Sequence, residues 1–392
     1  MGIVDEILSL VEKHEEWRGR KCINLIPSEN VMSPKVRSLL STDLAHRYTA
    51  RDKFYMGTKY IDEIEELGEK IAKEVFGGEY ADLRPLSGHV ADMIILGCLT
   101  EVGDTIMCVS EENGGYPGLS SEGAPKRLKL KVEYFPYSIE KRNIIIEEAE
   151  KLIIEKKPKL LFFGASFMLF PHPVKELAKA AEEVNATVVY DGSHVLGLIA
   201  GGEFQDPLKE GAKILVGSTH KTLFGPQGGL IVSTREYSEK IERNIMHKYV
   251  DNAHWNRIAA LTLALAEIRE YGKEYAKQVV KNAVELARSL SDIGLPVACE
   301  KYGFTKCHQI LLDYGSKGYK IAKKLEEANI IVDCGVRLGT SEVTRRGMKE
   351  NEMRQIAEFI GRILVEGEKP EKVKFDVVKL AMEFQEVEYC FK

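Results

Sequence analysis

Apolar residues in the first hundred positions recur at the spacing of helices. Residues 3–16 carry them at three- and four-residue steps, which predicts an amphipathic helix. The same steps predict a second helix from Tyr60 to Phe76 and a third from Val90 to Leu99. Gly77 and Gly78 are the predicted end of the second helix. Since a lone helix over residues 3–16 would expose its apolar stripe, we expect that stripe to pack on another surface.

The middle of the chain alternates between short apolar runs and helical patterns. Apolar runs bounded by polar or glycine residues predict buried strands. We expect strands at Thr105–Val109, Leu160–Phe163, Thr187–Tyr190, Ile214–Val216 and Leu230–Val232, with a helix at Val174–Val184. Strands separated by helices indicate an α/β fold whose sheet is mainly parallel, with crossover connections.

Polar residues follow three of these runs directly. Ser166 comes after the run at 160–163, Asp191 ends the next, and Ser218 to Lys221 follow the run at 214–216. Because ligands bind at the carboxyl ends of parallel strands, we expect these side chains to meet at one edge of the sheet. Three polar groups converging there indicate a site better than any one of them alone.

Beyond Val232 the pattern changes. Residues 258–290 are mostly helical by periodicity, with a predicted break near Tyr271–Gly272. A strand at 307–313, a helix at 319–328 and a strand at 330–332 predict a smaller α+β domain. We therefore divide the chain into an N-terminal arm (1–50), a large domain (51–255) and a linking helix with a small C-terminal domain (256–392).

Composition excludes several classes of protein. The 392 residues are 44% apolar and 29% charged, with a net charge of −5 and no basic block, which argues against nucleic-acid binding. No apolar run is long enough to cross a membrane. None of the seven cysteines forms a C-x-x-C pair, so we expect neither metal nor disulfides, but thiols in a reducing cytoplasm.

Lys221 is the strongest candidate for chemistry. A lone lysine is usually a solvated loop residue. This one follows a predicted buried strand and precedes a turn rich in glycine, where a lysine can lose solvation, drop its pKa and form a Schiff base with a carbonyl. Two weaker generic signals accompany it. Ser87-Gly88-His89 at the start of a helix can present backbone N–H groups to an anion, and Asp191 could equally be a helix cap.

The segment Ser218-Thr-His-Lys-Thr-x-x-Gly-Pro-x-Gly-Gly229 resembles the lysine motif of serine hydroxymethyltransferases. Leu25-Ile-Pro-Ser-Glu-Asn30 and Arg337-Leu-Gly-Thr340 resemble two further signatures of that family, and the similarity runs from about Leu25 to Met348. The resemblance implies a divergent, archaeal-type member. It also implies fold type I of the pyridoxal 5'-phosphate enzymes, with a mainly parallel seven-stranded sheet covered by helices on both faces and a smaller α+β C-terminal domain.

The resemblance also implies roles for individual residues. Lys221 would carry the cofactor covalently, and Asp191 would face its pyridine nitrogen, so that the ring acts as an electron sink. The remaining cofactor-binding residues would be Ser87, Gly88, His89, Tyr116, Ser166, Ser193, His194, Ser218 and His220. Tyr116 would stack on the ring, although the glycines before it would equally suit a surface turn. Arg337 and Ser28 would hold the substrate carboxylate, since guanidinium binds carboxylate through two parallel hydrogen bonds. His220 or a tyrosine would assist proton transfer.

The chain departs from the family pattern in three places. The tract from Tyr48 to Tyr55 keeps both tyrosines, which we assign to the substrate site, but lacks the family's proton-transferring glutamate; Asp52 is the one acid nearby. The loop before Arg337, which helps to hold the folate in the family, is short. The lysine motif itself has Phe224 and Gln227 where many bacterial members differ. The cofactor machinery is thus matched, whereas the machinery for a reduced pterin is partly missing.

Three functions remain open from sequence alone. The family default is serine–glycine interconversion with a pterin, in one-carbon metabolism. The second is a pterin-independent aldolase or other lyase acting on a β-hydroxy amino acid, and the third is a non-catalytic scaffold that binds the cofactor. We expect a homodimer with shared active sites, because the family places the residue matching Tyr55 in the neighbouring subunit's site. The apolar stripe near the N-terminus independently favours an interface, since an exposed stripe of this kind is typical of a surface that a partner covers.

Overall fold

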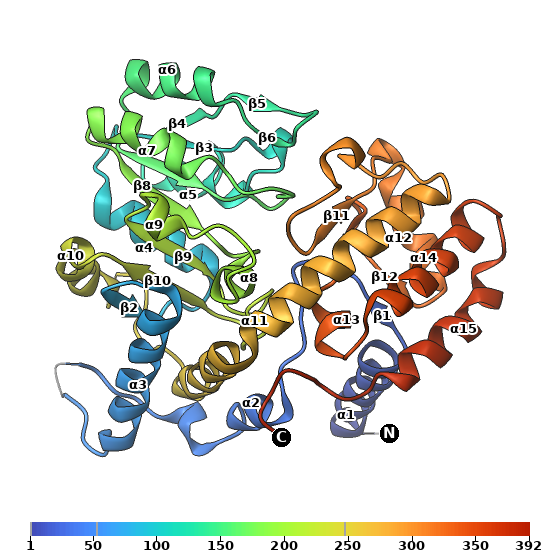
Figure 1. Ribbon diagram of the computed structural model, residues 1–392. Coiled ribbons are helices and arrows are strands. Elements are labelled where there is room, and N and C mark those ends of the chain that lie inside the picture. Colours follow the sequence, from blue (N-terminus) through green and yellow to red (C-terminus); the bar gives the residue numbers. More distant parts are fainter. Residues whose placement is uncertain (1, 52–53, 247) are drawn as a thin grey trace. The chain divides into compact units, whose positions relative to one another are not determined.

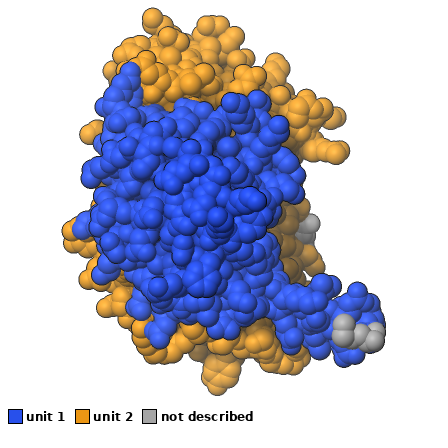
Figure 2. Space-filling model, turned by 90° about the vertical axis from the view of Figure 1, so that its right-hand side faces the viewer, with its two compact units in different colours: residues 1–29, 278–388 blue, residues 30–277, 389–392 orange. Residues whose placement is uncertain are grey.

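The computed structural model describes residues 2–51, 54–246 and 248–392. It groups into two compact units, which are coloured separately in Figure 2. Residues 30–277 and 389–392 form the larger unit, and residues 1–29 and 278–388 form the smaller one. The predicted division at residues 50 and 255 stays a prediction.

The larger unit is built on a seven-stranded sheet in the order β2-β10-β9-β8-β7-β3-β4 (Figure 1). β3 and β4, β3 and β7, β7 and β8, and β8 and β9 pair in parallel, whereas β10 runs antiparallel to both of its neighbours. The sheet strands are β2 (Tyr80–Asp82), β3 (Thr105–Cys108), β4 (Lys131–Tyr134), β7 (Leu160–Phe163), β8 (Thr187–Asp191), β9 (Ile214–Ser218) and β10 (Gly229–Ser233). The predicted α/β fold with a mainly parallel sheet is confirmed.

Continuous apolar runs become the buried centre of this sheet. Every residue of β7, β9 and β10 is buried, which is why their sequences do not alternate between apolar and polar residues. Helix α4 packs on β9 and β10, and α7 packs on β8. The helices of this unit are α2 (Pro34–Leu39), α3 (Lys59–Phe76), α4 (Gly88–Leu99), α5 (Ala124–Arg127), α6 (Ile146–Lys156), α7 (Val174–Glu183), α8 (Leu196–Ala200), α9 (Pro207–Glu210) and α10 (Arg235–Ile245); a hairpin of β5 (Tyr137–Ser138) and β6 (Asn143–Ile144) completes it.

Helix α11 (Trp255–Asp292) contributes residues to both units and corrects one prediction. It runs through Tyr271 and Gly272 without the predicted break. Gly272 has a packing role instead. A Cβ on Gly201, at the end of α8, would lie 2.4 Å from the Gly272 carbonyl oxygen, so two glycines let these backbones approach closely.

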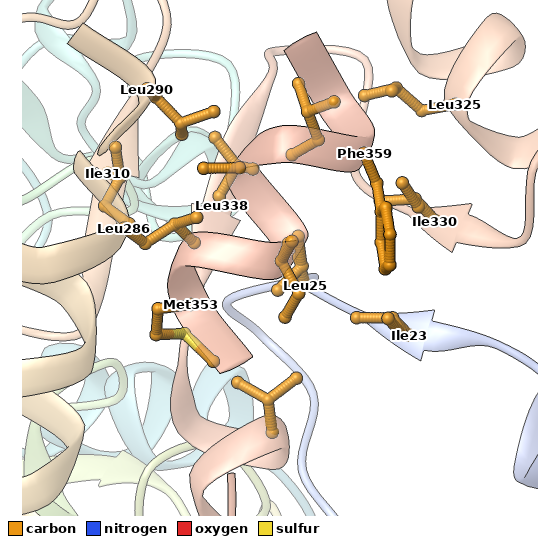
Figure 3. Packing of buried hydrophobic residues seen from close by; sticks show 14 of the residues in the cluster. Ile23, Leu25, Leu286, Leu290, Ile310, Leu325, Ile330, Leu338, Met353 and Phe359 are labelled. Atoms are coloured by element: carbon orange, nitrogen blue, oxygen red, sulfur yellow. The ribbon is translucent and has the colours of Figure 1, made fainter. Parts of the chain in front are cut away.

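The smaller unit joins the two ends of the chain around one apolar cluster. β1 (Ile23–Asn24) pairs in parallel with β12 (Ile330–Ile331), and β11 (Gln309–Leu311) pairs antiparallel with β13 (Arg337–Gly339). Figure 3 shows Ile23 and Leu25 packed among side chains that include Phe359, Met353 and Ile330. Its remaining helices are α1 (Ile3–His14), which a π-helical turn (Glu15–Arg20) extends, α12 (Gly318–Glu327), α13 (Ser341–Arg345), α14 (Glu350–Leu364) and α15 (Pro370–Glu383).

Two surface properties follow from this arrangement. The apolar side chains of α1 between Ile3 and Val11 are each at least 55% exposed. Within the described chain they therefore bury little apolar surface. None of the described helices has the length and apolar character needed to cross a membrane.

Candidate functional site

Lys221 lies in a tight turn at the carboxyl end of β9. The Thr219 hydroxyl donates to the Pro226 carbonyl oxygen at 2.6 Å, and the Gly225 N–H donates to the Thr219 carbonyl oxygen at 2.8 Å. These bonds fold the chain back on itself, so that β10 starts at Gly229. Phe224 takes a left-handed backbone conformation in this turn (φ 52°).

Asn30 fixes the backbone at the lysine, and no sequence argument predicted this. Its Nδ2 donates both to the Lys221 carbonyl oxygen and to the Tyr275 hydroxyl, at 2.9 Å each. The Tyr275 ring in turn packs edge-on against Phe224, with centroids 5.1 Å apart. The position of Asn30 at the end of the Leu25–Asn30 signature was the available signal.

The N-terminus of α4 is an open backbone cradle. Ser87 caps the helix, since its hydroxyl accepts from the Val90 N–H at 3.1 Å. A Cβ on Gly88 would lie 2.4 Å from Ser218 Oγ, and a Cβ on Gly229 would lie 2.3 Å from the Ser87 carbonyl oxygen. Glycine is therefore required at both positions, and a helix N-terminus of this kind suits an anion.

One pocket gathers most of the cofactor-binding residues that the sequence predicted. It is lined by His89, Tyr116, Ser166, Asp191, Ser193, His194, Ser218 and Lys221, together with Asp92 and Ala165. Within it the Ser193 N–H donates to Asp191 Oδ1 at 2.9 Å, and the Ser218 N–H donates to Ser193 Oγ at 2.9 Å. The Asp191 carboxylate is thus oriented by the turn that follows its own strand. Ser87 and Gly88 lie beside the pocket in the cradle.

Burial sets the ionisation of two groups here. The pKa of His220 is lowered to about 4 by burial and by the neighbouring Lys221 charge, so the imidazole is neutral at pH 7. The pKa of Tyr116 is raised to about 12, with burial as the largest cause, so its phenol keeps its proton. The Tyr116 ring lies edge-on to His89 at 5.9 Å, while His220 is adjacent to Lys221 but not among the pocket-lining residues.

The predicted substrate-binding residues are not among those that line this pocket. Ser28 and Arg337 belong to the smaller unit, where the Gly339 N–H donates to the Leu25 carbonyl oxygen at 2.7 Å and brings their two segments together. Arg337 Nε donates to Asp333 Oδ2 at 2.8 Å. Tyr48 and Tyr55 are 49% and 39% exposed, with ring centroids 5.5 Å apart; Asp52, between them, lies outside the described residues.

The residues present fit pyridoxal 5'-phosphate. Both carboxyl oxygens of Asp92 and Nδ1 of His89 are buried without a hydrogen-bond partner among the described residues, which marks the pocket as built for a polar ligand. The glycine cradle suits a phosphate, Lys221 suits an aldehyde, and Asp191 suits a ring nitrogen.

Comparison with known proteins agrees with this chemistry. The family model described as "Serine hydroxymethyltransferase" matches residues 2–360. The chain belongs to the serine hydroxymethyltransferase family. Two relatives named serine hydroxymethyltransferase support this family assignment. That of Methanocaldococcus jannaschii is 45% identical, covering 97% of this chain and 94% of the relative, and that of Methanopyrus kandleri is 44% identical, covering 99% and 95%.

A solved structure extends the similarity to the fold. The crystal structure of L-threonine transaldolase from Pseudomonas fluorescens, in its internal aldimine state, superposes with a TM-score of 0.92 at 25% identity, covering 99% of this chain and 94% of that one. The resemblance seen in the sequence and the fold of the pyridoxal phosphate enzymes are thereby confirmed for this serine hydroxymethyltransferase family member. The family is one of pyridoxal phosphate–dependent transferases.

Proposed function

We propose that this chain makes or breaks the Cα–Cβ bond of serine, glycine or a related β-hydroxy amino acid, with pyridoxal 5'-phosphate held on Lys221. The observation that carries the proposal is the convergence of Lys221, Asp191 and the anion cradle of α4 on one pocket. The names of the relatives support the reaction class. A non-catalytic scaffold would have little use for this complete set.

The bound cofactor supplies an electron sink for the bond that breaks. Ser87, Gly88 and His89 would hold its phosphate at the start of α4, and Tyr116 would cover its ring. Asp191 stays oriented by the Ser193 N–H, so that its carboxylate holds the proton on the ring nitrogen. Neutral His220, next to Lys221, is in the correct state to accept a proton.

Arg337 and Ser28 bind the carboxylate of the amino-acid substrate in this proposal. The Asp333 carboxylate accepts from Arg337 Nε and orients the guanidinium group. Strand β13, which begins at Arg337, is joined to the segment before Ser28 by the hydrogen bond from the Gly339 N–H to the Leu25 carbonyl oxygen. A guanidinium anchored in this way suits the bidentate grip that a carboxylate requires.

Serine–glycine interconversion with a reduced pterin is the leading reaction, and a pterin-independent aldolase or related lyase is the second. The second is favoured by the missing glutamate in the tract from Tyr48 to Tyr55 and by the short turn before Arg337. A threonine transaldolase among the structural relatives points the same way. Assays of serine and of threonine-type substrates with and without a reduced pterin separate the two. Strict dependence on the pterin removes the second reaction, and full activity without it removes the first.

Borohydride reduction tests the cofactor site directly. The purified protein should absorb in the visible, and reduction should fix the cofactor on Lys221, as located by mass spectrometry of peptides. Lys221→Arg should abolish this covalent attachment. A reduced adduct on any other lysine would overturn the assignment.

We also propose a homodimer whose active sites use Tyr55 of the neighbouring subunit. The exposed apolar residues of α1 and the exposed Tyr55 support an interface. Mixed dimers of two inactive variants, Tyr55→Ala and Lys221→Ala, should regain part of the activity, since one site of the two would be intact. A monomer by light scattering, or hybrids that stay inactive, would refute sharing.

A cytoplasmic location completes the proposal. The seven cysteines, all within the described residues, form no disulfide. Six of them are at least partly buried, and such thiols persist in a reducing compartment. Oxidation-sensitive labelling in intact cells would test this, since a disulfide between any pair would contradict it.

A further inference from the structure

Asp92 is a residue of the pocket whose chemistry the proposed function leaves unused. It lies on α4, is 1% exposed, and neither of its carboxyl oxygens has a hydrogen-bond partner among the described residues. Within the same helix, the neighbours from Val90 to Leu99 are almost all apolar. Removing a carboxyl from water without a partner is costly, so a protein that retains one at a pocket wall is expected to use it on a ligand.

The location of Asp92 follows from helix geometry. It comes three residues after His89, so the two side chains share one face of α4 and both reach the pocket. The titratable groups from other elements that line the pocket with it are Asp191 at the end of β8, His194 after it, Lys221 after β9, and Tyr116. Asp92 therefore stands one helical turn beyond the phosphate cradle, among the groups that would surround the cofactor ring.

The state of this carboxyl is set by the same surroundings. Burial raises the pKa of Asp92 well above its usual range, and the Asp191 carboxyl raises it further, whereas the Lys221 charge lowers it. An ionised Asp92 would also repel a phosphate bound at the start of its own helix. Asp191 Oδ1 accepts from the Ser193 N–H, whereas neither Asp92 oxygen has a hydrogen-bond partner among the described residues, so a charge on Asp92 would lack that stabilisation.

We propose that Asp92 is a cofactor-binding residue whose carboxyl group keeps its proton and hydrogen-bonds the pyridoxal phosphate in this pocket. This inference rests on the proposed cofactor site. It assigns the two acids opposite tasks: Asp191 stabilises positive charge on the ring, and Asp92 adds a hydrogen bond without adding negative charge.

The test compares Asp92→Asn with Asp92→Leu, because the amide keeps hydrogen-bonding capacity without a titratable proton and the alkyl group keeps only the bulk. Cofactor affinity is measured by titrating each apoprotein with pyridoxal phosphate between pH 6 and 9, following the visible absorbance. Asp92→Asn should bind within about threefold of wild type at pH 6, whereas Asp92→Leu should bind about tenfold or more weakly, the equivalent of one hydrogen bond. Affinity of the wild type should fall at alkaline pH more steeply than that of Asp92→Asn, which cannot ionise.

Each other outcome overturns the proposal. Equal affinities for all three proteins would show that Asp92 does not contact the cofactor. Asp92→Asn as weak as Asp92→Leu, or a pH profile identical to that of wild type, would show that no proton on Asp92 takes part. If Asp92→Leu does not fold, the pH profile of Asp92→Asn still decides the matter. Borohydride trapping on Lys221 is checked in parallel, because trapping elsewhere refutes the proposed cofactor site itself, whereas trapping on Lys221 with indifferent Asp92 variants refutes this inference alone.

Discussion

Gly88→Ala should damage the cofactor site by steric overlap alone. The new Cβ would lie 2.4 Å from Ser218 Oγ, and 2.9 Å from both Ser193 Oγ and the Ser218 backbone nitrogen. A hydroxyl can rotate away, but the Ser218 nitrogen belongs to β9 and cannot. The contact there is about 0.5 Å shorter than ordinary van der Waals contact, so the start of α4 must move by a similar distance.

The size of the effect can be worked out from this overlap. Overpacking of a buried site costs about 1–3 kcal/mol, and replacing glycine with alanine returns about 0.4–1 kcal/mol through the unfolded chain. We expect the apoprotein to lose about 1–2 kcal/mol of unfolding free energy in urea titrations. Moving the backbone N–H groups that we propose hold the phosphate should weaken cofactor binding by about tenfold or more, the loss of at least one charge-assisted hydrogen bond.

A second background isolates the cause. The Ser218→Ala variant lacks the hydroxyl oxygen that is nearest to the new Cβ. Adding Gly88→Ala to that variant should therefore lower the unfolding free energy by less than adding it to the wild type. Gly19→Ala is the matched control, because its Cβ would meet no atom closer than 3.8 Å. Equal costs in the two backgrounds, or unchanged cofactor affinity in Gly88→Ala, would refute the reasoning.

Three further predictions concern the framework around the site. Burial opposes ionisation of Asp82, but the charge and hydrogen bonds of Arg84 outweigh it and lower the pKa of Asp82 to about 2. The stability that this pair contributes is therefore present above about pH 4 and is lost as the pH falls towards 2. Asp82→Asn should reduce the unfolding free energy by about 3 kcal/mol in urea titrations at pH 7 and by much less at pH 2. Burial lowers the pKa of His172 to about 4, so unfolding free energy should fall by up to about 3 kcal/mol as the pH drops from 6.5 to 4, a slope that His172→Gln should lack. Gly164→Ala should shift Asp191, because Gly164 has a φ of 103° and its Cβ would lie 2.1 Å from the Asp191 carbonyl oxygen; normal cofactor affinity in this variant would contradict the close approach.

The central sheet and most of the pocket could be predicted from sequence because their signals are local. The strand at 160–163 has the predicted bounds, and β8 ends at Asp191, because continuous apolar runs bounded by polar residues have few alternative structures. The convergence of Ser166, Asp191 and Lys221 follows from parallel topology alone, and the structure places all three in one pocket.

What sequence missed depends on packing between distant segments. Gly272 looked like a helix break, but its role is contact with Gly201, some 70 residues away, which no periodicity reveals. Asp92 carried a local signal, an acid in an apolar helix next to the cradle, yet only the structure shows that its oxygens have no hydrogen-bond partner among the residues it describes. Asn30 was part of a recognised signature, but its bond to the Lys221 backbone spans about 190 residues.

The pairing of β1 with β12 imposes an order on biosynthesis. Ile23 finds its partner Ile330 only after roughly 300 further residues have left the ribosome. All but the last four residues of the larger unit are translated before that, so its sheet can form while Ile23 and Leu25 are still unpaired. During this interval the nascent chain exposes the apolar residues of both its first helix and its first strand. A stalled or truncated chain that stops before residue 330 would thus expose an apolar segment near its N-terminus, to which a chaperone could bind.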